Sequence, residues 1–317
     1  MLGIIKYVVV FGGSGFIGRY IVEDLVKNDC VVKVFTRNAD KAASLKLYGN
    51  LGNVEIIEYS TLNIEIVERH VNKCDVVINL IGILYESKKI KFNYVHVVIA
   101  EIIAKIANKY CAKLIHFSAM GIENAKDSVY AQSKLKGEKI VTAVCSNTII
   151  IRPNLVFGFG DHFFSNIARL SLMLPFLPLI RGGEMLLQPV YVGDIAKLVS
   201  YLVCYNTKKT LYNICGPKIY SIKSLMGFIL QVTHRKNAFI KLPLCIAKVL
   251  AFICECKITS IMLKPITGST VPLFTRDQLL FMQYNITSDT KDLESINISP
   301  HFMEDIVQKC LEVYKKL

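Results

Sequence analysis

Short apolar runs alternate with segments of helical spacing along the first half of the chain. Residues 4–11 form a nearly unbroken, β-branched run, which is typical of a strand buried on both faces. Similar runs predict further strands at 31–36, 54–59, 75–80, 113–118 and 148–151. Apolar residues three or four positions apart predict helices at 15–27, 39–47, 64–72, 95–110 and 129–145. The alternation predicts an α/β fold with a Rossmann-like, doubly wound parallel sheet covered by helices.

The alternation stops after Pro153, and the second half of the chain has a different pattern. A short strand followed by a helix is predicted at 189–204, with Asp194 as the helix N-cap. One more strand is predicted at 211–215, and from residue 221 the spacing is helical with loops. We therefore expect a Rossmann domain at 1–155 to which 188–215 returns, and a smaller, mostly helical lobe made of 156–187 and 216–317.

The first predicted strand runs directly into the sequence GGSGFIG (12–18), and a predicted helix follows. In this spacing Gly12 permits a tight turn, Gly15 lets a pyrophosphate approach the backbone, and Gly18 lets the helix pack closely on the strand. The helix N-terminus directs free N–H groups and a partial positive charge at the phosphates. Because strand, glycine loop and helix occur in the required order, the segment predicts a dinucleotide site rather than a plain turn.

The end of the second predicted strand bears on which dinucleotide binds. NAD sites usually carry Asp or Glu about 20 residues beyond the glycines, whereas an arginine suits the 2′-phosphate of NADP. Here Thr36 and Arg37 occupy the position and no acid is present. Since a guanidinium pairs bidentately with phosphate, we favour NADP(H) and keep NAD(H) open. The other interpretation is that Arg37 is a solvated strand end.

Composition narrows the classes of partner. The 317 residues include 38 Lys and Arg against 25 Asp and Glu, a net charge of +13, yet 52% are hydrophobic. Such a chain is neither intrinsically disordered nor a small disulfide scaffold. The charge is compatible with nucleic acid, an anionic membrane surface or a phosphate-bearing ligand. We expect no nucleic-acid partner, because the chain has no recognised motif and no basic-aromatic cluster.

The cysteines and the first residues bear on location. Ten cysteines are scattered along the chain and only Cys254 and Cys256 are close together, so we expect reduced thiols and no metal site. The apolar run at 4–11 is too short to span a membrane and lacks the features of a signal peptide. We expect a bacterial cytoplasmic protein without a transmembrane span, and leave open peripheral contact with the cytoplasmic face of the inner membrane.

Tyr130 and Lys134 are spaced i, i+4 on one face of a predicted helix. A nearby ammonium lowers the pKa of a phenol and so readies it for proton transfer to a carbonyl, and Lys134 is also placed to hold the nicotinamide ribose. The plain alternative is an exposed pair. Because the pair follows a glycine loop and a fifth strand that ends at Ser118, we interpret it as part of the dinucleotide site.

These motifs resemble the extended branch of the short-chain dehydrogenase/reductase superfamily. The resemblance rests on GGSGFIG (12–18), DVVINLIG (75–82), HFSAMG (116–121), YAQSK (130–134), RPNLVFG (152–158) and QPVYVGDIA (188–196). Within the superfamily, the chain is most similar to the Rossmann-fold accessory subunits of respiratory complex I and their bacterial relatives. That similarity rests on GDHFF (160–164), KLPLCIAKVL (241–250) and FTRDQL (274–279).

The resemblance implies a set of cofactor-binding residues and, among them, two catalytic residues. The catalytic pair is Tyr130 and Lys134, which are vestigial if turnover has been lost. The implied cofactor-binding residues are Gly12, Ser14, Gly15, Phe16, Ile17, Gly18, Thr36, Arg37, Asn38, Leu80, Ile81, Gly82, Phe117, Ser118, Tyr130, Lys134 and Pro153. We expect Gly82 to allow close approach of the cofactor to the backbone.

The chain departs from the superfamily pattern around the tyrosine. The Ser or Thr that binds the reacting carbonyl in extended enzymes is replaced at or near Met120, and Ser118 lies two residues earlier. The segment from 118 to 130 is short, and His96 takes the place of a helical Asn. These departures imply nucleotide binding with reduced or absent turnover, because the stabilisation of the developing oxyanion is lost.

Three functions remain open from the sequence. The first is a structural, nucleotide-binding subunit of a membrane respiratory complex; the second is an active NADPH-dependent reductase or sugar-nucleotide epimerase/dehydratase; the third is a nucleotide-sensing regulator. Two apolar segments, 170–180 and 239–257, are either core of the small lobe or contact a membrane or partner through an apolar surface fringed by lysines. Of the histidines, we expect His96 and His116 to be structural and His162, in a loop beside the cleft, to be the better functional candidate.

Overall fold

The computed structural model describes residues 5–50, 52–87, 89–255 and 275–315. In these residues, one sheet of seven parallel strands runs through the larger lobe in the order β11-β6-β5-β4-β1-β2-β3. The strands are β1 (Tyr7–Phe11), β2 (Val31–Thr36), β3 (Val54–Glu58), β4 (Val76–Asn79), β5 (Lys113–Phe117), β6 (Thr148–Pro153) and β11 (Leu211–Ile214). The predicted doubly wound sheet is therefore confirmed.

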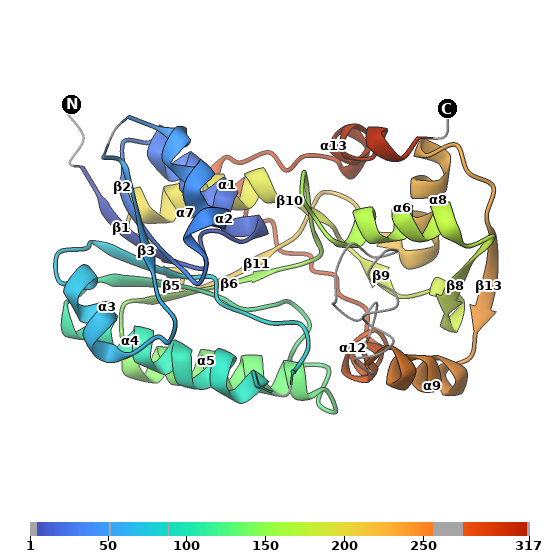
Figure 1. The fold of residues 1–317 in the computed structure, drawn as a ribbon, viewed down its shortest axis with the longest axis horizontal. Coiled ribbons are helices and arrows are strands. Elements are labelled where there is room, and N and C mark those ends of the chain that lie inside the picture. Colours follow the sequence, from blue (N-terminus) through green and yellow to red (C-terminus); the bar gives the residue numbers. More distant parts are fainter. Residues whose placement is uncertain (1–4, 51, 88, 256–274, 316–317) are drawn as a thin grey trace.

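Both faces of the sheet are covered by helices, as Figure 1 shows. The two faces of β1 illustrate why, because Val8 and Val10 pack on one side whereas Val9 and Phe11 pack on the other. The first side carries α1 (Phe16–Lys27), α2 (Ala39–Ala42), the 3₁₀ helix η1 (Ala43–Tyr48) and α7 (Val192–Cys204). The second carries α3 (Ile64–Val71), the π-helical turn η2 (Asn93–Val98), α4 (Ile99–Lys109) and α5 (Val129–Val144).

The smaller lobe has its own apolar core, centred on Phe157, Phe164 and Leu225. It contains more extended chain than the helical spacing predicted, in three two-stranded sheets: β7 (Val156–Phe157) with β10 (Val190–Tyr191), β9 (Leu186–Leu187) with β12 (Tyr220–Ser221), and β8 (Phe176–Ile180) with β13 (Ala238–Leu242). Its helices are α6 (Phe163–Met173), η3 (Arg181–Gly183), α8 (Ile222–Val232), α9 (Leu244–Glu255), α12 (Arg276–Phe281), α13 (Met303–Cys310) and η5 (Glu312–Tyr314).

The two apolar segments singled out in the sequence lie side by side. Residues 176–180 form β8, and 238–242 form β13, which pairs with it in parallel. The interpretation of 239–257 as a core helix is wrong, because only Ala247 and Ala251 of α9 are buried. The larger residues of α9 are exposed, Val249 by 60% and Ile246 by 49%. Lys257 and Cys256 lie outside the described residues.

Asp194 is not the N-cap of α7. Tyr191 occupies that position, and Asp194 lies inside the first turn, where its fully buried carboxylate accepts hydrogen bonds from the backbone N–H and Nδ1 of His301, at 2.8 and 2.7 Å. The carboxylate therefore joins α7 to the segment that precedes α13. An aspartate interacts favourably with the helix dipole both at the N-cap and in the first turn, so the sequence alone does not distinguish these two positions.

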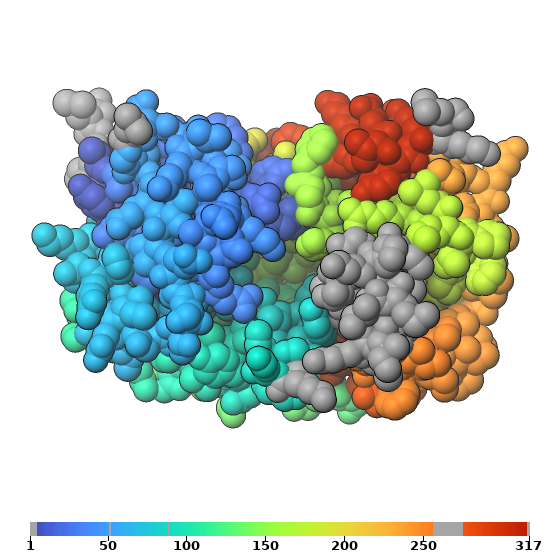
Figure 2. Space-filling model, in the orientation of Figure 1, coloured from blue at the N-terminus to red at the C-terminus, as the bar shows by residue number. Residues whose placement is uncertain are grey.

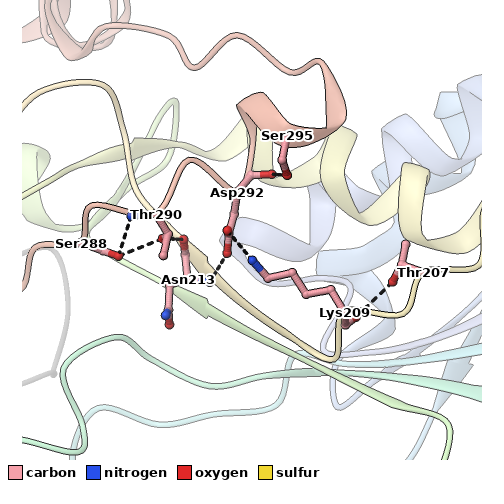
Figure 3. Close-up of polar contacts among 7 residues, drawn as sticks. All are labelled: Thr207, Lys209, Asn213, Ser288, Thr290, Asp292 and Ser295. Atoms are coloured by element: carbon pink, nitrogen blue, oxygen red, sulfur yellow. Dashed lines mark hydrogen bonds and ion pairs between the residues drawn. The ribbon is translucent and has the colours of Figure 1, made fainter.

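The chain returns from the small lobe to cover the outer strand of the sheet, and Figure 3 shows the contacts that hold it. Asp292, 5% exposed, accepts hydrogen bonds from the Lys209 ammonium at 2.5 Å and from the Asn213 backbone at 2.9 Å. The Thr290 hydroxyl donates to the Asn213 carbonyl at 3.2 Å. Leu293 then packs into the core beneath α1 and α7, just before η4 (Glu294–Ile296). The open edge of β11 is thus shielded.

Candidate functional site

The sequence-predicted residues come together at the carboxyl edge of the sheet. They occupy the β1–α1 loop, the ends of β2, β4, β5 and β6, and the start of α5. The strand order reverses at β1, which pairs with β2 on one side and β4 on the other. Ligands of open parallel sheets bind at such a switch point. The space-filling view shows a groove between this lobe and the smaller one (Figure 2).

The glycine loop has the geometry that a close-packed turn requires. Gly12 has a φ of +82°, which favours glycine, and its carbonyl accepts a hydrogen bond from the Gly15 N–H at 3.0 Å. Gly15 is the N-cap of α1, with Phe16 and Ile17 in the first turn. A Cβ at Gly18 would lie 2.5 Å from the Gly12 carbonyl oxygen, so only glycine lets the helix pack this closely. The loop leaves the start of α1 open to a ligand.

The end of β2 is tied to the glycine loop by side chains. The Thr36 hydroxyl lies 2.9 Å from that of Ser14, and Thr36 is 4% exposed. Asn38 caps α2 by accepting from the Lys41 N–H at 2.8 Å. Arg37, between them, is exposed and forms no hydrogen bond or ion pair with another described residue. Its guanidinium is therefore available to an anion placed over the glycine loop.

The ends of β4 and β5 are linked by buried polar groups. The Asn79 side chain accepts from the Ile81 N–H at 3.0 Å and contacts Nδ1 of His116 at 3.1 Å. Burial lowers the pKa of His116 to about 3, with a further contribution from the Lys134 charge, so His116 is neutral and structural. Leu80, which leads from β4 to Ile81, packs beside Gly12. Four separate strand ends are thus fixed relative to one another.

Lys134 reaches this edge from α5 and is 6% exposed. Its ammonium donates to the carbonyl of Phe117 at 3.2 Å, and burial lowers its pKa to about 8. A Cβ at Gly82 would lie 3.2 Å from this ammonium, so the open side of Gly82 makes room for Lys134 as well as for a ligand. Beside it, the buried Ser118 Oγ has no hydrogen-bond partner among the described residues. This buried hydroxyl is free to form a hydrogen bond with a polar atom of a ligand.

The Tyr130 side chain is surrounded by aromatic rings. Its ring meets those of Phe92, His96 and Phe281 at centroid distances of 5.7, 5.6 and 5.9 Å. The expectation that Lys134 lowers the phenol's pKa is wrong for this structure. Burial raises the pKa of Tyr130, and the negative charge of Asp277 raises it further. The phenol therefore holds its proton firmly.

His96 connects the β4 loop to α5 through a chain of hydrogen bonds. Its Nε2 accepts from the Ile83 N–H at 3.1 Å, so the proton is on Nδ1, which lies 2.8 Å from the Ser133 hydroxyl. That hydroxyl donates to the Tyr130 carbonyl at 2.7 Å. Burial lowers the pKa of His96 to about 2. His96 is therefore neutral and joins the β4 loop to α5 by hydrogen bonds, in agreement with the prediction that it is structural. It lies in the π-helical turn η2.

Met120 occupies the position where the resemblance implies a Ser or Thr hydroxyl that binds the reacting carbonyl. It is 6% exposed, and its sulfur lies 3.4 Å from the Asn154 amide nitrogen and 3.5 Å from the Cys215 sulfur. Its backbone N–H donates to the carbonyl of Pro153, the last residue of β6. The side chain therefore belongs to the core of the small lobe and presents no donor to a substrate.

Two further side chains near the site, Asp277 and His162, bear on the sequence-based expectations. Asp277, which carried no predicted role although it lies in FTRDQL, contacts the start of α5: it accepts from the backbone N–H groups of Val129 and Tyr130 at 2.7 and 3.1 Å. An aspartate in a helix's first turn is too common a signal to reveal this contact. His162 is exposed just before α6, and its side chain has no polar partner among the described residues.

Comparisons with known proteins agree with this architecture. The chain is 30% identical over 244 residues to the mitochondrial NADH-ubiquinone oxidoreductase 40 kDa subunit of Neurospora crassa, covering 76% of the chain and 64% of that relative's length. It is 27% identical over 314 residues to NADH dehydrogenase (ubiquinone) 1 alpha subcomplex subunit 9 of Arabidopsis thaliana mitochondria, covering 97% of the chain and 77% of the relative. The chain thus spans less than two thirds of the first relative.

Solved structures share the fold at low sequence identity. The dTDP-glucose 4,6-dehydratase of Bacillus anthracis, in complex with NAD, matches with a TM-score of 0.70 and 16% identity over 98% of this chain and 96% of that one. The sequence profile described as NAD dependent epimerase/dehydratase family matches residues 8–215, which include the glycine loop and the Tyr130–Lys134 pair. The chain belongs to the NAD dependent epimerase/dehydratase family.

Proposed function

We propose that this chain is an NADP(H)-binding accessory subunit of a membrane NADH:ubiquinone oxidoreductase, with a structural nucleotide and little or no turnover. The subunit role is taken from the Neurospora and Arabidopsis relatives, which are named as subunits of that enzyme. The observation that carries the loss of turnover is Met120, whose side chain is packed between Asn154 and Cys215 instead of facing a substrate carbonyl.

The residues present fit a dinucleotide. Gly18 leaves no room for a side chain against Gly12, which keeps the start of α1 open to a pyrophosphate, and the unpaired Ser118 hydroxyl offers a hydrogen bond beside Lys134. A bound dinucleotide would supply a hydride donor or acceptor at this edge. Arg37, exposed at the end of β2, favours the 2′-phosphate of NADP over the free ribose of NAD. NADP(H) is therefore the proposed ligand, held by the residues that the resemblance implies.

Tyr130 and Lys134 would position the nucleotide more than react with it. The Lys134 ammonium is engaged by the Phe117 carbonyl, and the pKa of Tyr130 is raised, so the pair does not form a phenol poised to release a proton. Without a hydroxyl donor at Met120, a reacting carbonyl would lack the stabilisation that dominates such reactions. A nucleotide that binds the native state and is not consumed would stabilise the fold.

The outer face of α9 is the proposed membrane contact. Ile246, Val249, Leu250 and Ile253 follow the spacing i, i+3, i+4, i+7 and are 38–60% exposed, whereas the small Ala247 and Ala251 face inward. Large apolar residues outside and small ones inside reverse the usual order for a surface helix. The exposed Lys248 on the helix and Lys241 just before it match anionic lipid headgroups.

The apolar surface of α9 is large enough for its burial to support peripheral membrane binding. Four half-exposed aliphatic side chains would each contribute about 1 kcal/mol on entering the bilayer interface, or about 4 kcal/mol together.

None of the described helices combines the length and apolar character needed to traverse a bilayer. The described cysteines other than Cys254 are free thiols, which fits a reducing compartment such as the bacterial cytoplasm. We place the protein at the inner membrane's cytoplasmic face.

Mass spectrometry of the purified native protein tests the nucleotide assignment. The proposal expects bound NADPH or NADP⁺, and a purified protein that carries NAD(H) or has no affinity for either nucleotide would overturn it. Turnover is then assayed with NADPH and a panel of quinones, ketones and nucleotide sugars, comparing wild type with Tyr130→Phe. The proposal expects no activity above that of the variant.

A second function is an active NADPH-dependent reductase or sugar-nucleotide epimerase. The observation that favours it is the retention of Tyr130 and Lys134 on one face of α5, within the family whose profile the chain matches. Robust turnover that Tyr130→Phe abolishes would establish this function and overturn the accessory role without turnover.

A further inference from the structure

Helix α12 lies between the helix that carries Tyr130 and Lys134 and the helix proposed to contact the membrane. Its first turn contacts the start of α5, and its length packs against α9. We propose that α12 couples the two sites, so that nucleotide binding in the groove strengthens docking of α9 on an anionic membrane, and docking strengthens nucleotide binding. This coupling rests on the proposed function and adds a regulation to it.

The contact with α5 is made by one carboxylate. Asp277 accepts hydrogen bonds from the Ser128 hydroxyl at 2.8 Å, from the Val129 N–H at 2.7 Å and from the Tyr130 N–H at 3.1 Å. Ser128 is fully buried and is itself the N-cap of α5, accepting from the Ala131 N–H at 3.1 Å. A charge from another part of the chain therefore completes the start of this helix, where a carboxylate is favoured.

An aromatic residue of α12 also contacts the side chain of Tyr130. Phe281, the last residue of α12, meets the Tyr130 ring edge-on at 5.9 Å. Asp277 and Phe281 thus hold the first turn of α5 at both the backbone and the aromatic side chain. The charge of Asp277 also raises the pKa of Tyr130, so α12 acts on Tyr130 electrostatically as well as through these contacts.

The contact with α9 is apolar along the helices and charged at the end. Leu279 is fully buried against Ala247 and Ala251, the two inward residues of α9. At the end of α9, Glu255 accepts from the Arg276 backbone at 2.7 Å and from its guanidinium at 2.9 Å. Arg276 and Asp277 are adjacent, so the two charged side chains of α12 contact α9 and α5 from neighbouring positions, the first through an ion pair and the second through hydrogen bonds.

A displacement of α9 would have to move α12 or break these contacts. If α12 left α5, the Ser128 hydroxyl and two backbone N–H groups would lose their acceptor at the turn that leads into Tyr130. A ligand that orders α5 therefore favours the arrangement in which α12 and α9 are in place. Coupling between two binding sites is reciprocal, so a membrane that holds α9 in place favours the nucleotide to the same extent.

The test measures two dissociation constants for the full chain. NADPH binding is titrated without vesicles and with phosphatidylcholine vesicles that contain phosphatidylglycerol, and vesicle binding is measured by flotation with and without NADPH. For wild type we expect each ligand to tighten the other about fivefold or more. In Asp277→Asn and in Glu255→Gln, which disconnect α12 at opposite ends, we expect both ligands still to bind but the mutual enhancement to fall towards onefold. Asp289→Asn removes an exposed carboxylate elsewhere and keeps the wild-type enhancement.

The outcomes separate this inference from the proposed function. If wild type binds both NADPH and vesicles independently, or if Asp277→Asn and Glu255→Gln keep the full enhancement, the coupling is wrong and the proposed function stands. If wild type binds no NADPH or no anionic vesicles, the proposed function fails and the coupling fails with it. Circular dichroism and thermal unfolding of each variant establish that a lost enhancement does not come from a lost fold.

Discussion

Replacing Arg37 with alanine isolates the group that is proposed to select NADP(H). The guanidinium is exposed and has no ionic partner among the described residues, so the substitution breaks no contact of the free protein. Hydrogen bonds to a charged group contribute about 1.5–3 kcal/mol, and exposure to solvent places Arg37 at the lower end, about 1.5–2 kcal/mol. This corresponds to an NADPH dissociation constant about 10- to 30-fold weaker, with NADH affinity changed by less than about threefold.

The assay is titration of both nucleotides by calorimetry or by nicotinamide fluorescence at constant ionic strength. Arg69→Ala is the matched control, since Arg69 is exposed in the last turn of α3, which leads to the amino end of β4 and so to the opposite edge of the sheet. Equal weakening of NADPH and NADH in Arg37→Ala, or an equal effect of Arg69→Ala, would refute the assignment of the 2′-phosphate to Arg37.

Three further predictions concern stability and docking. Glu138→Ala removes the carboxylate that contacts the Arg152 guanidinium at 2.8 and 2.7 Å, both groups being 10–13% exposed, and leaves Arg152 the longer contact with Glu123 at 3.4 Å. The substitution should cost about 3 kcal/mol in urea unfolding, the lower end for a broken buried pair, and a cost below about 1 kcal/mol would contradict a buried pair. The pKa values of His96 and His116 are lowered to about 2 and 3, so below about pH 6.5 these two histidines bind more protons in the unfolded chain than in the native one. Each should lower the free energy of unfolding by about 1.2 kcal/mol between pH 6 and 5, and Asp161, whose pKa is raised by burial to about 6, should offset part of this fall. Stability that does not fall with pH in this window would show that the two histidines are not held neutral. The double variant Val249→Glu with Ile253→Glu should weaken binding to anionic vesicles at least about tenfold in flotation. The control Leu47→Glu, at an 83% exposed site in the other lobe, should not weaken it. Equal effects of the two would show that α9 does not contact the membrane.

The larger lobe was predictable because its signals are local. Each strand is a β-branched run and each covering helix has apolar residues at helical spacing, so the order of elements follows from the chain itself. The glycine loop was predictable for the same reason, since the turn, the helix start and the close contact of Gly18 with Gly12 lie within seven consecutive residues. The assignment of Met120 to the place of a missing hydroxyl depended on the resemblance, and the structure adds where its side chain goes.

The smaller lobe was less predictable because its signals depend on distant partners. β13 was taken as part of a helix, since its apolar residues become a strand only by pairing with β8, about sixty positions earlier. The pKa of Tyr130 was predicted with the wrong sign because i, i+4 spacing indicates proximity to Lys134 but not the burial of the ring or the charge of Asp277, 147 residues away. The face of α9 that points outward likewise follows from its contact with α12.

Purification of NADH:quinone oxidoreductase from native membranes tests the central claim most directly. The chain should co-purify in stoichiometric amount with the core subunits, and mass spectrometry of the same preparation should find one NADP(H) per copy. A chain that is recovered as a free monomer in the soluble fraction, with none in the purified oxidoreductase, would contradict the account.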